Sequence, residues 1–247
     1  MCARNEEDSV SATIQQHLAL FKELQTAIKL LQIGCREVQS IDGANDFYHL
    51  AILTLANGFE RFMKVIVCMR ILESTGGYPT KAPWPQGKEG HNLVFLLKKV
   101  VEDCFPDDYI TQIPAAAADI QYLRTSDRLH EIVGLLSGFG QAARYYNLDL
   151  VMGRDPKGES PDDVWARLEM AILQEDPNWE ESYQKDTDMS RSFQKINHSI
   201  VSSMERLARA LSRLFTLGGL GAQARQFSGT VYPFLMLRDD QLGNTRY

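Results

Sequence analysis

Residues 45–74, NDFYHLAILTLANGFERFMKVIVCMRILES, form a 30-residue stretch with no proline and a single glycine, Gly58. Large apolar side chains are so dense in it that a helix formed here must be buried on most of its sides. Thirty helical residues span about 45 Å. The stretch therefore predicts a long central helix around which the other elements pack.

Other segments repeat apolar residues at helical spacing. The first, residues 9–33, is expected to end at Gly34 and to turn one apolar face inward, made of Ile14, Leu18, Phe21, Leu24 and Ile28. Further helices are predicted at residues 91–105, 115–136, 161–173 and 187–217, and a glycine- and proline-rich loop at 75–90. Only residues 231–237 are compatible with a short strand. This pattern predicts an all-α, up-and-down helical bundle.

The motifs of several enzyme classes are absent from the sequence. It has no G-x-x-x-x-G-K-[ST] phosphate loop and no H-E-x-x-H pair, and its five histidines lack metal-ligand spacing. The four cysteines lie far apart without a C-x-x-C pair, which is typical of free thiols in a reducing cytoplasm. No apolar run is long enough to cross a bilayer. We therefore expect a cytoplasmic protein with no cofactor, no metal and no membrane contact.

Arg124 and His130 are separated by five residues. On one continuous helix they would lie about 120° apart around the axis and about 9 Å apart along it. Asp127 lies midway, so one interpretation is an exposed line of charges worth a few tenths of a kcal/mol per pair. The other is a metal-independent RNA-cleaving pair, because histidine is an acid or base near neutral pH and arginine stabilises phosphate charge.

Three features occur in a familiar order: ANGFERFMKVI at residues 56–66, GHNLVFLLKKV at 90–100, and the spacing of Arg124 and His130. In this order the chain resembles, over residues 10–150, the HEPN (higher eukaryotes and prokaryotes nucleotide-binding) superfamily of α-helical bundles. Members with an R-x4–6-H motif are commonly metal-independent RNases, often toxins or antiphage effectors, with the active site at a homodimer interface. The resemblance implies that Arg124 and His130 are catalytic, that RNA is the substrate and that the protein is a homodimer.

Charge is distributed unevenly along the chain. Between Asp155 and Asp188 there are eleven acidic and three basic residues, a net charge of −8 in a chain whose total is −6. We expect a single α-helical domain, with a HEPN-like core at residues 10–150, an acidic insertion at 153–188 and a C-terminal helix and tail at 187–247.

The last long helix carries a basic stripe. On a helical wheel, five of its residues lie within about 60° of Arg191: Lys195, His198, Arg206, Arg209 and Arg213. One interpretation is a solvated face, or a face neutralised by the acidic segment that precedes it. The alternative is a track for RNA, or a contact with an acidic partner.

Arg144 beside Tyr145 and Tyr146 offers a second substrate-binding candidate, able to clamp a phosphate and stack a base. The alternative is that these side chains anchor a loop against the bundle. The leading hypothesis for the whole protein is a metal-independent endoribonuclease. A helical interaction module that binds a protein partner or a nucleotide without catalysis is the second hypothesis.

Overall fold

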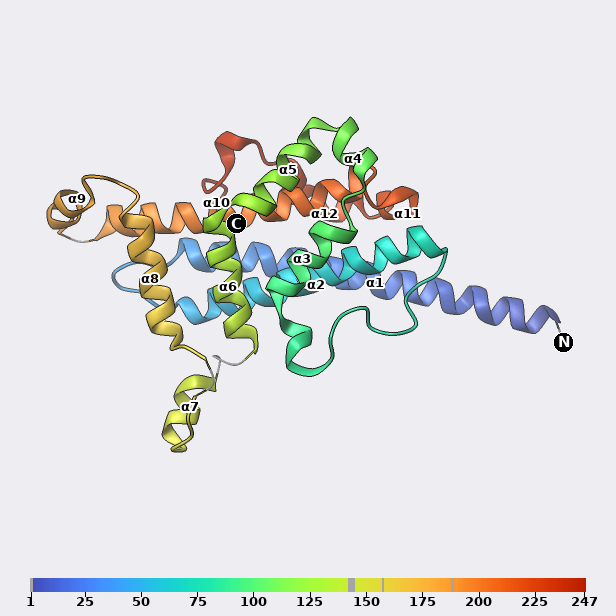
Figure 1. The fold of residues 1–247 in the computed structure, drawn as a ribbon, viewed down its shortest axis with the longest axis horizontal. Helices are drawn as coiled ribbons and strands as arrows, with labels where there is room; N and C mark the ends of the chain where they lie inside the picture. The colour runs from blue at the N-terminus through green and yellow to red at the C-terminus, as the bar shows by residue number, and fades with distance from the viewer. Residues whose placement is uncertain (1, 142–144, 157, 188) are drawn as a thin grey trace.

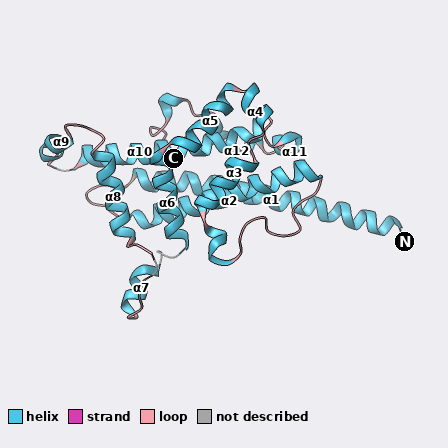
Figure 2. Cartoon of the chain, viewed as in Figure 1, coloured by secondary structure: helices cyan, strands magenta, loops and turns pink. Residues whose placement is uncertain are grey.

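The computed structural model describes residues 2–141, 145–156, 158–187 and 189–247, and every regular element in these ranges is helical (Figure 1, Figure 2). The all-α prediction is thereby confirmed. No helix in these ranges is long and apolar enough to cross a membrane. The longer helices are α1 (Cys2–Gln39), α2 (Tyr48–Thr75), α3 (Leu93–Asp103), α5 (Pro114–Thr125), α6 (Asp127–Gln141), α8 (Pro161–Leu173) and α10 (Ser190–Thr216). The shorter ones are α4 (Asp107–Gln112), α7 (Tyr146–Val151), α9 (Trp179–Lys185), α11 (Gly221–Arg225) and α12 (Ser228–Leu235), with 3-10 turns η1 (Gly87–His91) and η3 (Asp239–Gln241).

Helices α1 and α2 pack antiparallel along the long axis of the molecule (Figure 1). Two glycines make this close contact possible: a Cβ at Gly34 would lie 2.6 Å from Leu55 Cγ, and one at Gly58 would lie 2.8 Å from Leu31 Cδ2. The prediction that the first helix ends at Gly34 is wrong. The glycine packs against the next helix, and α1 continues to Gln39.

The N-terminal part of α1 extends beyond the rest of the bundle (Figure 1). Leu24 and Ile28 are buried as predicted, whereas Ile14 is 54% exposed and Leu18 is 53% exposed. The inward placement predicted for these two residues is wrong. A helical wheel gives the direction of a side chain but does not say whether a second helix lies opposite it.

The central position of α2 is confirmed. Its buried side chains include Phe59, Phe62 and Met63, and the ring of Phe62 lies 5.9 Å from that of Phe215 on α10. One contiguous hydrophobic core contains residues from Leu24 to Leu242. Because each large apolar side chain contributes roughly 1.5–3 kcal/mol when buried, this shared core is the main force holding the helices together.

The acidic segment shares this core. Its helix α8 has the predicted bounds, and it buries Trp165 and Leu168. The ring of Trp165 stacks on that of Tyr48 of α2 with centroids 5.1 Å apart, and the Tyr48 hydroxyl donates a hydrogen bond to Asp162. The segment predicted as an insertion therefore contributes one of the packed helices of the bundle.

The helix predicted at residues 115–136 is divided in two by Ser126, which has an extended backbone with φ −82° and ψ 103°. The Leu129 N–H donates to Ser126 Oγ over 3.3 Å, so the serine caps the start of α6. Prediction of one continuous helix is therefore wrong. The bend turns α6 away from α5, with consequences for Arg124 and His130.

The chain closes with α12 and a tail that is tied to α10. The prediction of a possible short strand at residues 231–237 is wrong, because α12 extends to Leu235. Val231 and Phe234 are buried three residues apart on one face of this helix. The fully buried carboxylate of Glu205 accepts hydrogen bonds from Gly243 N–H and from the Tyr247 hydroxyl, the latter over 2.6 Å. A buried acidic residue of α10 thus anchors the C-terminal tail.

Candidate functional site

Arg124 and His130 lie on opposite sides of the Ser126 bend. Arg124 is exposed in the last turn of α5, and His130 is exposed in the first turns of α6. The separation expected for one continuous helix therefore does not apply to them. No ion pair joins Arg124, Asp127 and His130, all three of which the structure describes. The proposed line of ion pairs is not formed.

The imidazole of His130 is bonded to the backbone of α5. Its Nε2 lies 2.8 Å from the carbonyl oxygen of Leu123. A carbonyl oxygen only accepts, so Nε2 carries the proton in this bond, and the assignment follows from the partner. The carbonyl belongs to the last turn of α5, where carbonyl groups lack partners within the helix. His130 thus joins the two helices across the bend.

The basic stripe is not a continuous exposed surface. Arg209 is only 5% exposed, and it donates to Leu237 O over 2.8 Å and to Asp239 Oδ1 over 2.6 Å. The hydrogen bond from Arg209, together with its positive charge, lowers the pKa of Asp239. Arg213 donates to the buried Asp119 Oδ1 over 2.7 Å. These two arginines face α5 and the C-terminal tail, so a track that runs the length of α10 is excluded.

Lys195 and Arg206, by contrast, line one polar groove of about 440 Å³. The groove lies between the α5–α6 junction, the C-terminal end of α8 and the middle of α10. Among the described residues its walls contain three cations, a histidine, four serines, one carboxylate, a tyrosine and an isoleucine: Tyr122, Ser126, Arg128, Ile172, Glu175, Lys195, His198, Ser199, Ser202, Ser203 and Arg206.

Contacts within the protein hold the two predicted cations of this groove. The guanidinium of Arg206 lies 3.9 Å from the centroid of the Tyr122 ring, a cation–π contact. The Tyr122 hydroxyl donates to Ser203 O over 3.3 Å, and burial raises its pKa. Lys195 Nζ donates to Leu173 O over 3.2 Å. Both cations are therefore positioned before any ligand arrives.

Acidic residues lie beside the cations of the groove. Two of them, Glu175 and Asp176, belong to the acidic segment, in line with the interpretation that this segment neutralises the stripe. Arg128 forms ion pairs with Glu131 and, over 2.8 Å, with Glu175, and its buried Nε has no hydrogen-bond partner among the described residues. Lys195 Nζ lies 4.0 Å from Asp176. Arg206 has its cation–π contact and no ion pair within the described ranges. Three carboxylates thus stand beside the three cations of the groove, and Arg206 is the cation that has no acidic partner among the described residues.

The prediction missed Arg128 and the serines, although the sequence carried a signal for the latter. Lys195, Ser199, Ser202 and Arg206 follow one another at helical spacing, so they had to share a face of α10. Arg128 and Tyr122 had no such signal. They belong to other helices, and only tertiary packing brings them to the groove.

The other predicted binding residues lie elsewhere. Arg144 is outside the described residues, and Tyr145 is 54% exposed before α7. Arg191, exposed near the start of α10, lines a second hollow of about 290 Å³ beside α9, and Lys195 borders both hollows. RNA binding by these residues stays a prediction.

No group of three histidine, cysteine or acidic side chains within the described ranges is arranged to hold a metal ion. The thiols of Cys35, Cys68 and Cys104 are unpaired. Burial raises the pKa of each of them, to about 11 for Cys68 and about 12 for Cys104. Protonated thiols are poor nucleophiles, which argues against nucleophilic chemistry at these three cysteines.

Comparison with known proteins adds no relative to this description. No family model, no curated protein and no solved structure matches the chain.

Proposed function

We propose that this protein binds RNA, with the phosphate backbone held in the groove between the α5–α6 junction and α10. The observation that carries the proposal is the convergence of Arg128, Lys195 and Arg206 with four serine hydroxyls on one hollow. Phosphate oxygens accept hydrogen bonds from both kinds of group, and charged donors form the stronger bonds.

The geometry suits a single strand better than a broad duplex surface. The groove is confined and its cations are few, while a chain with a net charge of −6 repels nucleic acid over most of its surface. The serines offer donors and acceptors for a ribose 2′-hydroxyl as well as for phosphate. Since Arg206 is stacked on Tyr122, less of its conformational freedom is lost on binding.

A second candidate activity is cleavage of that RNA by Arg124 and His130, as the HEPN resemblance implies. It is favoured by their position: both side chains are exposed and flank Ser126, which lines the groove. The ribose 2′-hydroxyl would give its proton to a base while its oxygen bonds to the adjacent phosphorus. The bond from phosphorus to the 5′-oxygen would break, that oxygen would leave with a proton from an acid, and a 2′,3′-cyclic phosphate would remain. A homodimer would bring two such pairs together.

The non-catalytic alternative has its own support. His130 Nε2 is bonded to Leu123 O, so this nitrogen serves to join two helices. A module that binds a nucleotide or an acidic protein partner would use the same groove without the pair. The two readings share the groove and differ in the role of His130.

Binding is tested by fluorescence anisotropy with a labelled single-stranded uridine oligonucleotide over a series of salt concentrations. The double variant Lys195→Ala/Arg206→Ala is expected to bind roughly tenfold more weakly and to lower the slope of log K against log salt by about 1.4, or about 0.7 per lost contact. The control Arg36→Ala/Lys98→Ala removes the same charge from exposed sites on α1 and α3. Equal losses of RNA affinity in the two double variants would overturn the proposal that RNA binds specifically in this groove. A wild-type protein that does not bind RNA would overturn it as well.

Cleavage is tested in the presence of EDTA with His130→Gln. Glutamine keeps an N–H donor for Leu123 O but cannot transfer a proton near neutral pH. Loss of about 10²–10⁴-fold in rate, with unchanged RNA binding, is the result expected of a general acid or base. Cleavage at the wild-type rate would leave His130 as a structural residue and the protein as an RNA-binding module.

A further inference from the structure

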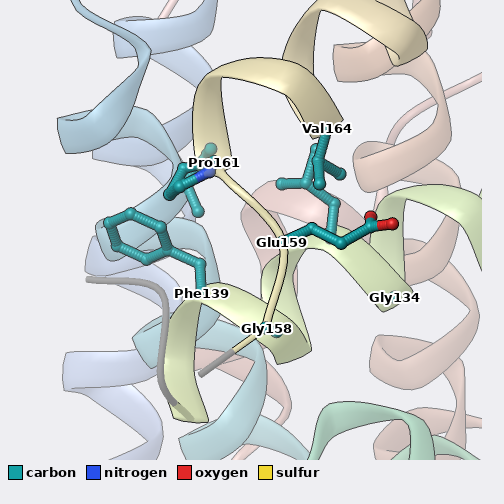
Figure 3. Close-up of a pocket in the computed structure, with 9 residues that line it drawn as sticks. Gly134, Phe139, Gly158, Glu159, Pro161 and Val164 are labelled. Atoms are coloured by element: carbon teal, nitrogen blue, oxygen red, sulfur yellow. The ribbon is translucent and has the colours of Figure 1, made fainter. Parts of the chain in front are cut away.

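A third hollow, distinct from the polar groove and from the hollow beside α9, lies between α2, α6 and the segment that leads into α8. It has a volume of about 290 Å³. Figure 3 shows Phe139 of α6 on one side, with Pro161 and Val164 of α8 above it. The lining is predominantly apolar: Ile52, Gly134, Leu135, Gly138, Phe139, Gly158, Glu159, Pro161 and Val164.

Two helical glycines open this cavity. Gly134 and Gly138 are four residues apart on α6, so they share the face that lines it. A Cβ built at either position would meet no atom within 4 Å. Glycine is among the poorest helix formers, and Gly34 and Gly58 are explained by the leucines packed against them. No packed neighbour explains Gly134 and Gly138, and the space beside them is part of the cavity.

The chemistry of the walls selects the class of ligand. No basic side chain among the described residues lines the cavity. The one carboxylate that the described lining contains, Glu159, is 68% exposed and forms an ion pair with Arg167, so its charge is already compensated. A charged ligand would lose its hydration here without gaining a partner. An uncharged apolar molecule would lose little and would gain contact with Phe139, Leu135 and Val164.

The volume sets the size of the ligand. A closed apolar cavity of about 150 Å³ takes up benzene. This hollow is about twice as large, and it is open to solvent beside the exposed Gly134 and Gly138. A molecule of two rings, or an aliphatic chain of similar bulk, therefore fits. An α-helix with its side chains is about 10 Å across, which is too wide to enter.

We propose that the cavity between α2, α6 and α8 is a binding site for an uncharged, apolar small molecule, and that Gly134 and Gly138 keep it open. The site is independent of the RNA groove, because the two hollows share no residue. Failure of one proposal leaves the other untouched.

The test uses the full-length protein and the neutral fluorophore N-phenyl-1-naphthylamine, which becomes bright in apolar surroundings. The wild type is expected to bind one equivalent with a saturable, blue-shifted signal. In Gly134→Leu/Gly138→Leu the side chains fill the cavity, and affinity should fall by roughly tenfold or more. The milder Gly134→Ala/Gly138→Ala adds only two methyl groups and should give an intermediate loss in a protein that folds at least as well.

The matched control is Gly229→Leu on α12, an exposed helical glycine that also has no atom within 4 Å of a Cβ. It should leave probe binding unchanged, and RNA binding should be unchanged in all three variants. A wild type that does not bind the probe would overturn the proposal. Probe affinity that is unaffected by both double variants would also overturn it, because the probe would then occupy another surface, such as the exposed side chains of Leu148 and Val151.

Discussion

Arg213 of α10 donates a hydrogen bond to Asp119 of α5 over 2.7 Å, and the carboxyl side chain is only 5% exposed. The second carboxyl oxygen of Asp119 has no hydrogen-bond partner among the described residues. Arg213 is therefore the main group that stabilises the negative charge of this buried carboxylate. Burial raises the pKa of Asp119, and the Arg213 hydrogen bond and charge oppose that effect. An arginine that belongs to a surface stripe in the sequence is thus a link between two helices.

Replacing Arg213 with alanine is expected to lower the free energy of unfolding by about 2–4 kcal/mol, because it leaves a buried carboxylate without a partner. Urea denaturation measures the change. The double variant Asp119→Ala/Arg213→Ala should lose less than the two single variants added together. Additive losses would show that the pair does not interact.

Gly34→Ala is expected to destabilise the protein by about 1–3 kcal/mol, because the new Cβ would overlap Leu55, whose backbone nitrogen is also within 3.1 Å. Alanine at the unobstructed Gly229 should instead stabilise it by roughly 0.5–1 kcal/mol, through helix propensity alone. Thermal unfolding of the two variants compares the effects. Stabilisation by both would contradict the close α1–α2 contact.

His130→Ala is expected to lower the free energy of unfolding by about 0.5–1.5 kcal/mol, since it removes the hydrogen bond to Leu123 O across the bend. His130→Gln should recover part of that loss, because its amide can donate to the same oxygen. Denaturant titrations of both variants report the difference. Wild-type stability in His130→Ala would rule out a role in joining α5 and α6.

Glu205→Gln is expected to gain stability relative to the wild type as the pH rises above the ordinary glutamate pKa near 4.3. Burial raises the pKa of Glu205, although bonds from Tyr247 and Gly243 and the nearby His198 oppose the shift. Between the ordinary value near 4.3 and this raised pKa, the folded wild type binds more protons than the unfolded chain. Wild-type stability therefore falls through that window, and a glutamine does not titrate.

Urea denaturation at several pH values, with the exposed Glu102→Gln as control, measures the difference in unfolding free energy between each variant and the wild type. The unfolding free energy of Glu205→Gln minus that of the wild type should increase as the pH rises. The same difference for Glu102→Gln should stay nearly constant. A change in the opposite direction would mean that the folded state stabilises the ionised carboxylate.

Helix positions were largely readable from local sequence. Helix α8 has its predicted bounds, and α2 and α10 lie within a few residues of theirs, because apolar spacing and proline positions act within one helix. The Ser126 bend also had a local signal, a serine followed by aspartate at the start of a helix, but a continuous apolar pattern concealed it.

The sequence by itself determined that this chain is helical and that Lys195 and Arg206 share one face of α10. Only the tertiary structure decided that Arg209 and Arg213 on that helix turn into the protein, and that Arg128 and Tyr122 complete the polar groove. The physical reason is that the helical period sets the direction of a side chain around its own axis. What lies in that direction, whether solvent, a carboxylate or another helix, depends on elements far away in the chain.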